Sequence, residues 1–177
     1  DERDLEGDLG GFGKARIACR LVFGGGRLDR LFAKNMPGSV DAIDADIRSK
    51  LALALDVDDL VAAIRLGRQL NGYFGVAKIG LELYSAAGPE AIGAIAELGY
   101  RIFLDVKLHD IPTTVGKAAR VLGALGVEYL TMHAHGGLEM LQAGVQGLDE
   151  GARNAGLDQP TALAITVLTS DAGAPIA

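Results

Sequence analysis

The chain has no tryptophan, one cysteine and few aromatic residues, which make up 5% of its 177 positions. A single cysteine, Cys19, excludes an intrachain disulfide framework and a cysteine-based zinc site, and it suits a reducing compartment. Lys and Arg (17) are outnumbered by Asp and Glu (23), which disfavours nucleic acid and anionic membranes, because both are bound through clustered cations. No apolar run approaches the ~18 residues of a membrane span. We therefore expect a soluble, cytoplasmic protein, and this composition leaves a small neutral or anionic metabolite open as its ligand.

Glycine and apolar residues, by contrast, are abundant: there are 25 glycines, and 49% of the chain is hydrophobic. This composition fits one domain with many short connections between strands and helices. The first 50 residues differ from the rest, because they hold nine acidic and nine basic residues, and residues 1–13 and the glycine triplet 24–26 show no sustained periodicity. Their Gly-rich segments lack the full spacing of a phosphate-binding loop. We expect 1–47 to be a poorly ordered N-terminal extension and 48–177 to be the folded domain.

Apolar runs of strand length alternate with helical patterns from Leu51 onward, and they recur about every 25 residues, the length of one βα unit. Asp58 is the expected cap of the first helix, and Pro89 and Gly99 are expected to bound the second. The predicted strands are 51–57, 74–79, 101–106, 127–133 and 161–168, and the predicted helices are 59–70, 89–98, 113–125 and about 137–155. This pattern predicts a parallel α/β sheet, either doubly wound or closed as a barrel.

Polar residues stand at the ends of the first four predicted strands: Asp56, Lys78, Asp105 with Lys107, and His133. The carboxyl ends of the strands are where barrel enzymes place their chemistry, so this distribution favours a (β/α)8 TIM barrel. Only about five βα units are recognisable where a barrel needs eight. We therefore expect a partial barrel, truncated at its C-terminus.

The segment LDVKLHDIPTTV, residues 104–115, carries the densest group of charges near a strand end. Asp105 and Lys107 are two residues apart, so on a strand their side chains leave the same face, and Asp110 follows in the loop. Ions in a buried strand cost several kcal/mol each unless they are closely paired, which makes a functional site the preferred interpretation. The alternatives are a salt-bridge cluster at the sheet margin and, for Lys78, a lysine whose stem lies along apolar surface while its amine reaches solvent.

This segment resembles the signature of the orotidine 5'-monophosphate decarboxylase family, D-x-K-x-x-D-I-x-x-T. The segments ALDV, AKIGLELY, HAHGG and TVLTS agree with the family in order and spacing, so the resemblance covers roughly 51–170. The wider superfamily shares D-x-K-x-x-D but not the continuation, which is Ile111, Pro112 and Thr114 in this chain.

The resemblance implies decarboxylation of orotidine 5'-phosphate to UMP, a step of pyrimidine biosynthesis, without metal or organic cofactor. Lys107 would stabilise the carbanion at C6 and donate a proton to it, and Asp105 would lie against the substrate carboxylate. Lys78 and Asp110 would complete an alternating Lys-Asp-Lys-Asp array that keeps Lys107 protonated.

The resemblance also implies the residues that bind the rest of the substrate. Asp56 and Lys78 would hydrogen-bond the ribose hydroxyls, Thr169 would meet the pyrimidine edge, and Ile111 and Thr114 would line the site. Family members are homodimers with shared sites, which would place Asp110 and Thr114 across the interface. A metal site built from the neighbouring histidines is disfavoured because Lys107 would repel a cation; its members would be His109, Asp110, His133 and His135.

The family's phosphate-binding Gln and Arg belong to segments after strands six to eight, and the chain has no counterpart of those segments. Two alternatives therefore stay open beside the decarboxylase. One is a truncated, inactive fragment of such an enzyme. The other is a sugar-phosphate lyase of the same superfamily, similar to 3-hexulose-6-phosphate synthase, which would require magnesium.

Overall fold

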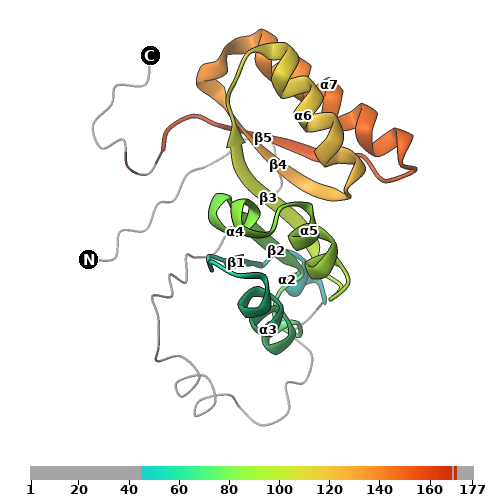
Figure 1. Ribbon diagram of the computed structural model, residues 1–177. Coiled ribbons are helices and arrows are strands. Elements are labelled where there is room, and N and C mark those ends of the chain that lie inside the picture. The colour runs from blue at the N-terminus through green and yellow to red at the C-terminus, as the bar shows by residue number, and fades with distance from the viewer. Residues whose placement is uncertain (1–44, 169, 171–177) are drawn as a thin grey trace.

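A computed structural model describes residues 45–168 and residue 170 of the chain (Figure 1). Strands and helices alternate along it as the sequence predicts. The elements are α2 (Ala45–Ser49), β1 (Ala52–Leu55), α3 (Leu60–Leu70), β2 (Val76–Gly80), α4 (Leu81–Ala87), α5 (Pro89–Ala96), β3 (Arg101–Leu108), α6 (Pro112–Ala124), β4 (Val127–His133), the 3-10 turn η1 (Ala134–Gly136), α7 (Gly137–Asn154) and β5 (Thr161–Ile165).

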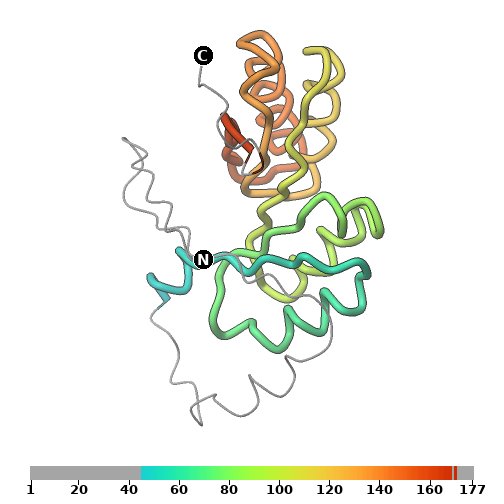
Figure 2. Tube along the Cα trace, turned by 90° about the vertical axis from the view of Figure 1, so that its left-hand side faces the viewer, coloured from blue at the N-terminus to red at the C-terminus, as the bar shows by residue number. Residues whose placement is uncertain are grey.

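The five strands form one parallel sheet in the order β1-β2-β3-β4-β5. A doubly wound sheet requires a reversal of strand order, and this sheet has none. Because crossovers between parallel strands are right-handed, a strictly sequential order places every connecting helix on the same face of the sheet. The chain accordingly advances from β1 to β5 without turning back (Figure 2). This is the arrangement of a (β/α)8 barrel, and it confirms the predicted fold class with five strands of the barrel present.

The core lies between this sheet and its helices. Alternate strand residues point toward the helices and are fully buried, as expected from the period of two in a strand. They include Leu55, Ile79, Ile102, Leu104, Leu130 and Met132, all at 0 or 1% exposure. The intervening residues face the opposite side, which corresponds to the inside of a barrel. The charged residues at the ends of the first three strands therefore share one face with partly buried aromatic rings, where Phe103 and Tyr129 pack edge to face.

The structure corrects several element boundaries. Asp59, not Asp58, caps α3, because its Oδ1 accepts a hydrogen bond from the amide of Ala62 at 2.7 Å. Helix α4 has no counterpart among the predicted helices. Strand β3 continues to Leu108, two residues beyond the prediction, and β5 ends at Ile165, three residues before it.

The amino end of the sheet is closed by α2. The carbonyl oxygen of Arg48 accepts a hydrogen bond from the amide of Gly75 at 2.8 Å, and the Arg101 guanidinium donates to the carbonyl of Ser49. Most of the predicted extension 1–47 lies outside the described residues, and its assignment stays a prediction. Among the described helices, none is both long and apolar enough to cross a membrane.

Candidate active site

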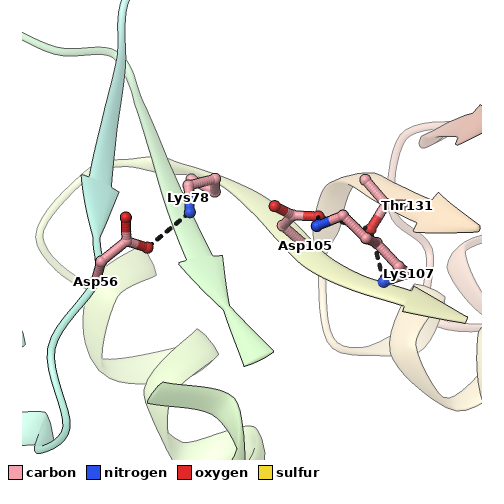
Figure 3. A network of polar contacts seen from close by, with 5 residues as sticks. All are labelled: Asp56, Lys78, Asp105, Lys107 and Thr131. Carbon is pink, nitrogen blue, oxygen red and sulfur yellow. Dashed lines mark hydrogen bonds and ion pairs between the residues drawn. The ribbon is translucent and has the colours of Figure 1, made fainter. Parts of the chain in front are cut away.

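Four of the predicted charged residues lie where the carboxyl ends of the first three strands meet. Asp56 follows the last residue of β1, Lys78 lies in β2, and β3 contributes Asp105 and Lys107. The parallel register aligns Leu55 with Ile79 and Gly80 with Asp105, so the three strand ends are level with one another. Figure 3 shows the four charged side chains in one neighbourhood, in two pairs.

Each pair joins one lysine to one aspartate. Lys78 Nζ lies 2.7 Å from Asp56 Oδ1, with side chains 22% and 41% exposed, and Lys107 Nζ lies 2.7 Å from Asp105 Oδ1, with side chains 37% and 17% exposed. Both pairs are half-buried, so they are accessible to a small molecule while still shielded from bulk water on one side. Asp105 is the least exposed of the four side chains.

The backbone at Lys107 is unusual. Its φ is 47°, in the left-handed region, and it is the only non-glycine residue with positive φ in the described part of the chain. A side chain in this region costs about 1–2 kcal/mol, so the surrounding structure must hold it there. The distortion coincides with a β-bulge: between the paired positions Leu104 and Leu108, β3 has three residues where β4 has one, Thr131. Bulges often redirect side chains at active sites, and this one carries Lys107.

Thr131 belongs to this site although the motif analysis did not single it out. Its side chain has no exposed surface, and its hydroxyl donates to Asp105 Oδ1 at 3.1 Å and accepts from the amide of Lys107 at 2.9 Å. The sequence did contain a signal for it: Thr131 is a polar residue inside the mainly apolar strand VEYLTMH, two residues before His133 and so on the same face.

Among the described residues, Asp110 forms no ion pair with Lys78 or Lys107. Asp110 is exposed, and its Oδ1 accepts a hydrogen bond from the amide of Ile111 at 2.6 Å at the start of α6. Ile111 is 66% exposed and Thr114 is also exposed. Of the predicted array, the contact between Lys107 and Asp105 is present within the chain, whereas Lys78 pairs with Asp56. The alternating array as a whole, with its contribution from Asp110, stays a prediction. Thr169 lies outside the described residues.

Three histidine rings neighbour one another: His109 follows β3, His133 ends β4 and His135 lies in η1. The rings of His109 and His133 are 5.0 Å apart, and those of His133 and His135 are also 5.0 Å apart. In the described ranges, no three or more histidine, cysteine, aspartate or glutamate side chains converge as metal ligands.

The fold and the site together define a class: part of a (β/α)8 barrel with two lysine–aspartate pairs at the carboxyl ends of its strands. Comparison with known families agrees, since residues 49–175 match the family described as "Orotidine 5'-phosphate decarboxylase / HUMPS family". The chain belongs to this family.

Curated relatives and solved structures support the same assignment. The chain is 47% identical over 123 residues to an orotidine 5'-phosphate decarboxylase of Moorella thermoacetica, covering 70% of this chain and 49% of that protein. It is 48% identical over 121 residues to the protein of the same name from Parasynechococcus marenigrum, covering 68% and 49%. The crystal structure of orotidine 5'-phosphate decarboxylase from Lactobacillus acidophilus is similar with a TM-score of 0.58 and 39% identity, covering 67% of this chain and 53% of that one. The chain thus spans about half the length of the curated relatives it matches.

Proposed function

We propose that this chain carries the decarboxylating residues of an enzyme that converts orotidine 5'-phosphate to UMP without a metal or cofactor. The observation that carries the proposal is the Lys107–Asp105 pair, held at 2.7 Å on a bulge of β3 within the D-x-K-x-x-D-I-P-x-T motif. The second pair, Lys78 with Asp56, lies on the two preceding strands.

The chemistry requires a cation beside the reacting carbon. When carbon dioxide leaves C6, the electron pair of the broken C–C bond stays on C6 and forms a vinyl carbanion. An ammonium at Lys107 Nζ stabilises that charge and then transfers its proton to C6, which gives UMP. The half-buried position of Lys107 strengthens this interaction relative to bulk water.

Asp105 has two roles in the proposal. Its carboxylate lies 2.7 Å from Lys107 Nζ and holds the proton-donating group in place. It also lies where the substrate carboxylate would approach, so repulsion between the two is relieved as carbon dioxide departs. Two unit charges ~4 Å apart at an effective dielectric constant near 20 interact by ~4 kcal/mol. This energy corresponds to about three powers of ten in rate, which is less than the full acceleration expected of an enzyme.

The remaining predicted residues would bind the rest of the substrate. Asp56 and Lys78 would hydrogen-bond the ribose hydroxyls. The 2.7 Å ion pair between them keeps the carboxylate and the ammonium group at the strand ends. Ile111, Thr114 and Thr169 would meet the base. The phosphate would be held by groups of the kind that the family supplies after strands six to eight.

We also propose that the working form is a cytoplasmic homodimer with shared sites. The exposed side chains of Asp110, Ile111 and Thr114 at the start of α6 support this, because 66% of Ile111 is available for burial against a partner. Asp110 would then complete the charge array of the neighbouring subunit.

The test is to follow the change in absorbance as orotidine 5'-phosphate is consumed, with the 177-residue chain and with the product of the complete reading frame that encodes it. Lys107→Ala should lower kcat by more than about 10³-fold. The matched control is Lys117→Ala, an exposed lysine on α6, which should leave kcat unchanged. Wild-type kcat in Lys107→Ala would disprove the assignment of the proton donor.

A metal-dependence arm separates this reaction from the sugar-phosphate alternative. Activity should survive EDTA, because Lys107 Nζ lies 2.7 Å from Asp105 Oδ1 and would repel a divalent cation at that carboxylate. Activity that is lost on EDTA treatment and restored by magnesium would favour the sugar-phosphate lyase. Absence of turnover in both proteins would overturn the proposed function.

A further inference from the structure

The hydroxyl of Thr131 contacts both residues of the Lys107–Asp105 pair. It accepts a hydrogen bond from the backbone amide of Lys107 at 2.9 Å and donates one to Asp105 Oδ1 at 3.1 Å. The same Asp105 oxygen lies 2.7 Å from Lys107 Nζ. One hydroxyl thus contacts the main chain of the lysine and the carboxylate that its side chain meets (Figure 3).

The position of Thr131 in the sheet explains why its hydroxyl, and not another group, meets the Lys107 amide. Thr131 is the single β4 residue opposite the three-residue bulge of β3, where the regular ladder between the two strands is interrupted. At this point the Lys107 amide donates to the Thr131 side chain of β4. Thr131 is 0% exposed, so water has no access to replace its hydroxyl.

The positive φ of Lys107 needs a restraint of this kind. A non-glycine residue at φ 47° reverts to extended backbone unless its neighbours hold it, and reversion would aim Lys107 Nζ elsewhere. The hydrogen bond from the Lys107 amide to Thr131 holds the backbone and so fixes the direction in which the lysine side chain leaves the strand. The hydrogen bond from Thr131 to Asp105 Oδ1 holds the carboxylate that the Lys107 side chain meets.

We propose that Thr131 is a positioning residue for decarboxylation, which acts by holding the Lys107 bulge and the Asp105 carboxylate in the geometry of proton transfer. The inference rests on the proposed function and extends it to a residue outside the family motif. It requires the hydroxyl, and not only the volume of the side chain.

Two substitutions separate the hydroxyl from the volume. Thr131→Val keeps the shape and removes both hydrogen bonds, and Thr131→Ser keeps the hydroxyl and removes a methyl group. Met132→Leu is the matched control, because Met132 is the next residue of β4, is equally buried, and faces the helices instead of the site. All three variants are compared with the wild-type protein in the same full-length form.

Steady-state kinetics provide the first readout. Thr131→Val should lower kcat by about 10- to 100-fold with little change in KM, because misplaced reacting groups lose rate more than ground-state binding. Thr131→Ser should stay close to wild type, and Met132→Leu should lower stability without a matching loss of kcat. Wild-type kcat in Thr131→Val, or an equal loss in Thr131→Ser, would overturn the proposal.

Amide hydrogen exchange of Lys107, followed by NMR without substrate, provides a readout independent of turnover. The Lys107 amide should be protected in the wild type and in Thr131→Ser and should exchange at least about tenfold faster in Thr131→Val. If no protein decarboxylates the substrate, the proposed function fails and this measurement still decides whether Thr131 holds the bulge. Equal protection in all variants would overturn the inference even if the enzyme is active.

Discussion

At the scale of single residues, the Lys78–Asp56 pair depends on space beside Gly80. A Cβ atom at Gly80 would lie 3.3 Å from Asp56 Oδ1 and 3.6 Å from Lys78 Nζ. The first distance is tight for a carbon against a carboxylate oxygen, so the pair would have to shift by a few tenths of an ångström. Gly80 ends β2 at the point where the strand meets the site.

Gly80→Ala should therefore impair substrate binding while leaving the fold intact. We expect a rise in KM of about three- to tenfold, since tenfold corresponds to ~1.4 kcal/mol. The free energy of unfolding should change by less than about 1 kcal/mol, because the backbone of Gly80 is one that alanine adopts. Gly93→Ala, which meets nothing within 4 Å, is the control for kinetics. An unchanged KM would show that the pair does not contact the substrate.

Tyr100 lies outside the site and contributes to the stability of the fold. It is 4% exposed, and its hydroxyl donates to the carbonyl of Gly67 in α3 at 2.8 Å. Burial raises the pKa of Tyr100 from 10.0 to about 12, partly offset by Arg48. The folded protein therefore holds the phenol proton more tightly than the unfolded chain does. The contribution of Tyr100 to the free energy of unfolding is complete below pH 10 and is lost as the pH rises from 10 through about 12.

Tyr100→Phe should reduce the steepness of this alkaline loss. At pH 7 the variant should be about 1 kcal/mol less stable, because the hydrogen bond to Gly67 is gone. Between pH 10 and 12 its free energy of unfolding should fall less steeply than that of the wild type. Urea denaturation across this pH range measures both effects, and parallel curves for the two proteins would contradict the assignment.

At the scale of elements, α6 and α7 pack so closely that glycine is required between them. A Cβ atom at Gly147 would lie 2.1 Å from the carbonyl oxygen of Gly116, and one at Gly151 would lie 2.0 Å from that of Arg120. These contacts involve backbone, which cannot rotate away. The packing matters for the site because α6 begins with the motif residues and α7 follows the strand that carries Thr131.

Gly151→Ala should destabilise the protein by about 1–3 kcal/mol or more, since the two helices must separate to admit the methyl group. Gly93→Ala, in α5, should be neutral or slightly stabilising, because alanine has the higher helix propensity and has free space there. Thermal denaturation of both variants tests this difference. Equal midpoints would mean that α6 and α7 adjust without cost.

Helix α4 shows the limit of local patterns at this scale. It has seven residues and buries only Leu83, and helices this short are unstable by themselves. Gly88, at φ 60°, ends it, and its amide donates to the carbonyl of Tyr84 at 2.7 Å. The helix thus depends on its place after β2, which a propensity or periodicity analysis does not contain.

At the scale of the whole molecule, the open question is where Asp110 acts. Within the chain its Oδ1 accepts a hydrogen bond from Ile111 and the side chain is exposed, so it is available to a second subunit. Mixing Lys107→Ala and Asp110→Ala subunits tests the shared site. In a twofold dimer one mixed site would carry both lesions and the other neither, so random exchange should restore about one quarter of all sites.

Each parent dimer should be nearly inactive before mixing. Exchange is verified by native mass spectrometry of differently tagged subunits, and activity is measured before and after it. Persistent inactivity after complete exchange would place Asp110 in the site of its own chain.

The sequence by itself determined the parallel α/β class, the positions of the five strands and the charged residues at their ends. Apolar runs that recur at the length of a βα unit are local signals, and the spacing of two residues between Asp105 and Lys107 was enough to predict that both belong to one site. The family motif then favoured a functional site over a structural salt bridge.

Only the tertiary structure decided which partner each charge takes and how Lys107 is held. The sequential strand order, the bulge opposite Thr131 and the close contact of α6 with α7 each depend on residues far apart in the chain. No local pattern specifies the register between β3 and β4, because register follows from how two strands and their helices pack together. For the same reason the role of Thr131 became visible only when the hydroxyl was seen between Asp105 and the Lys107 amide.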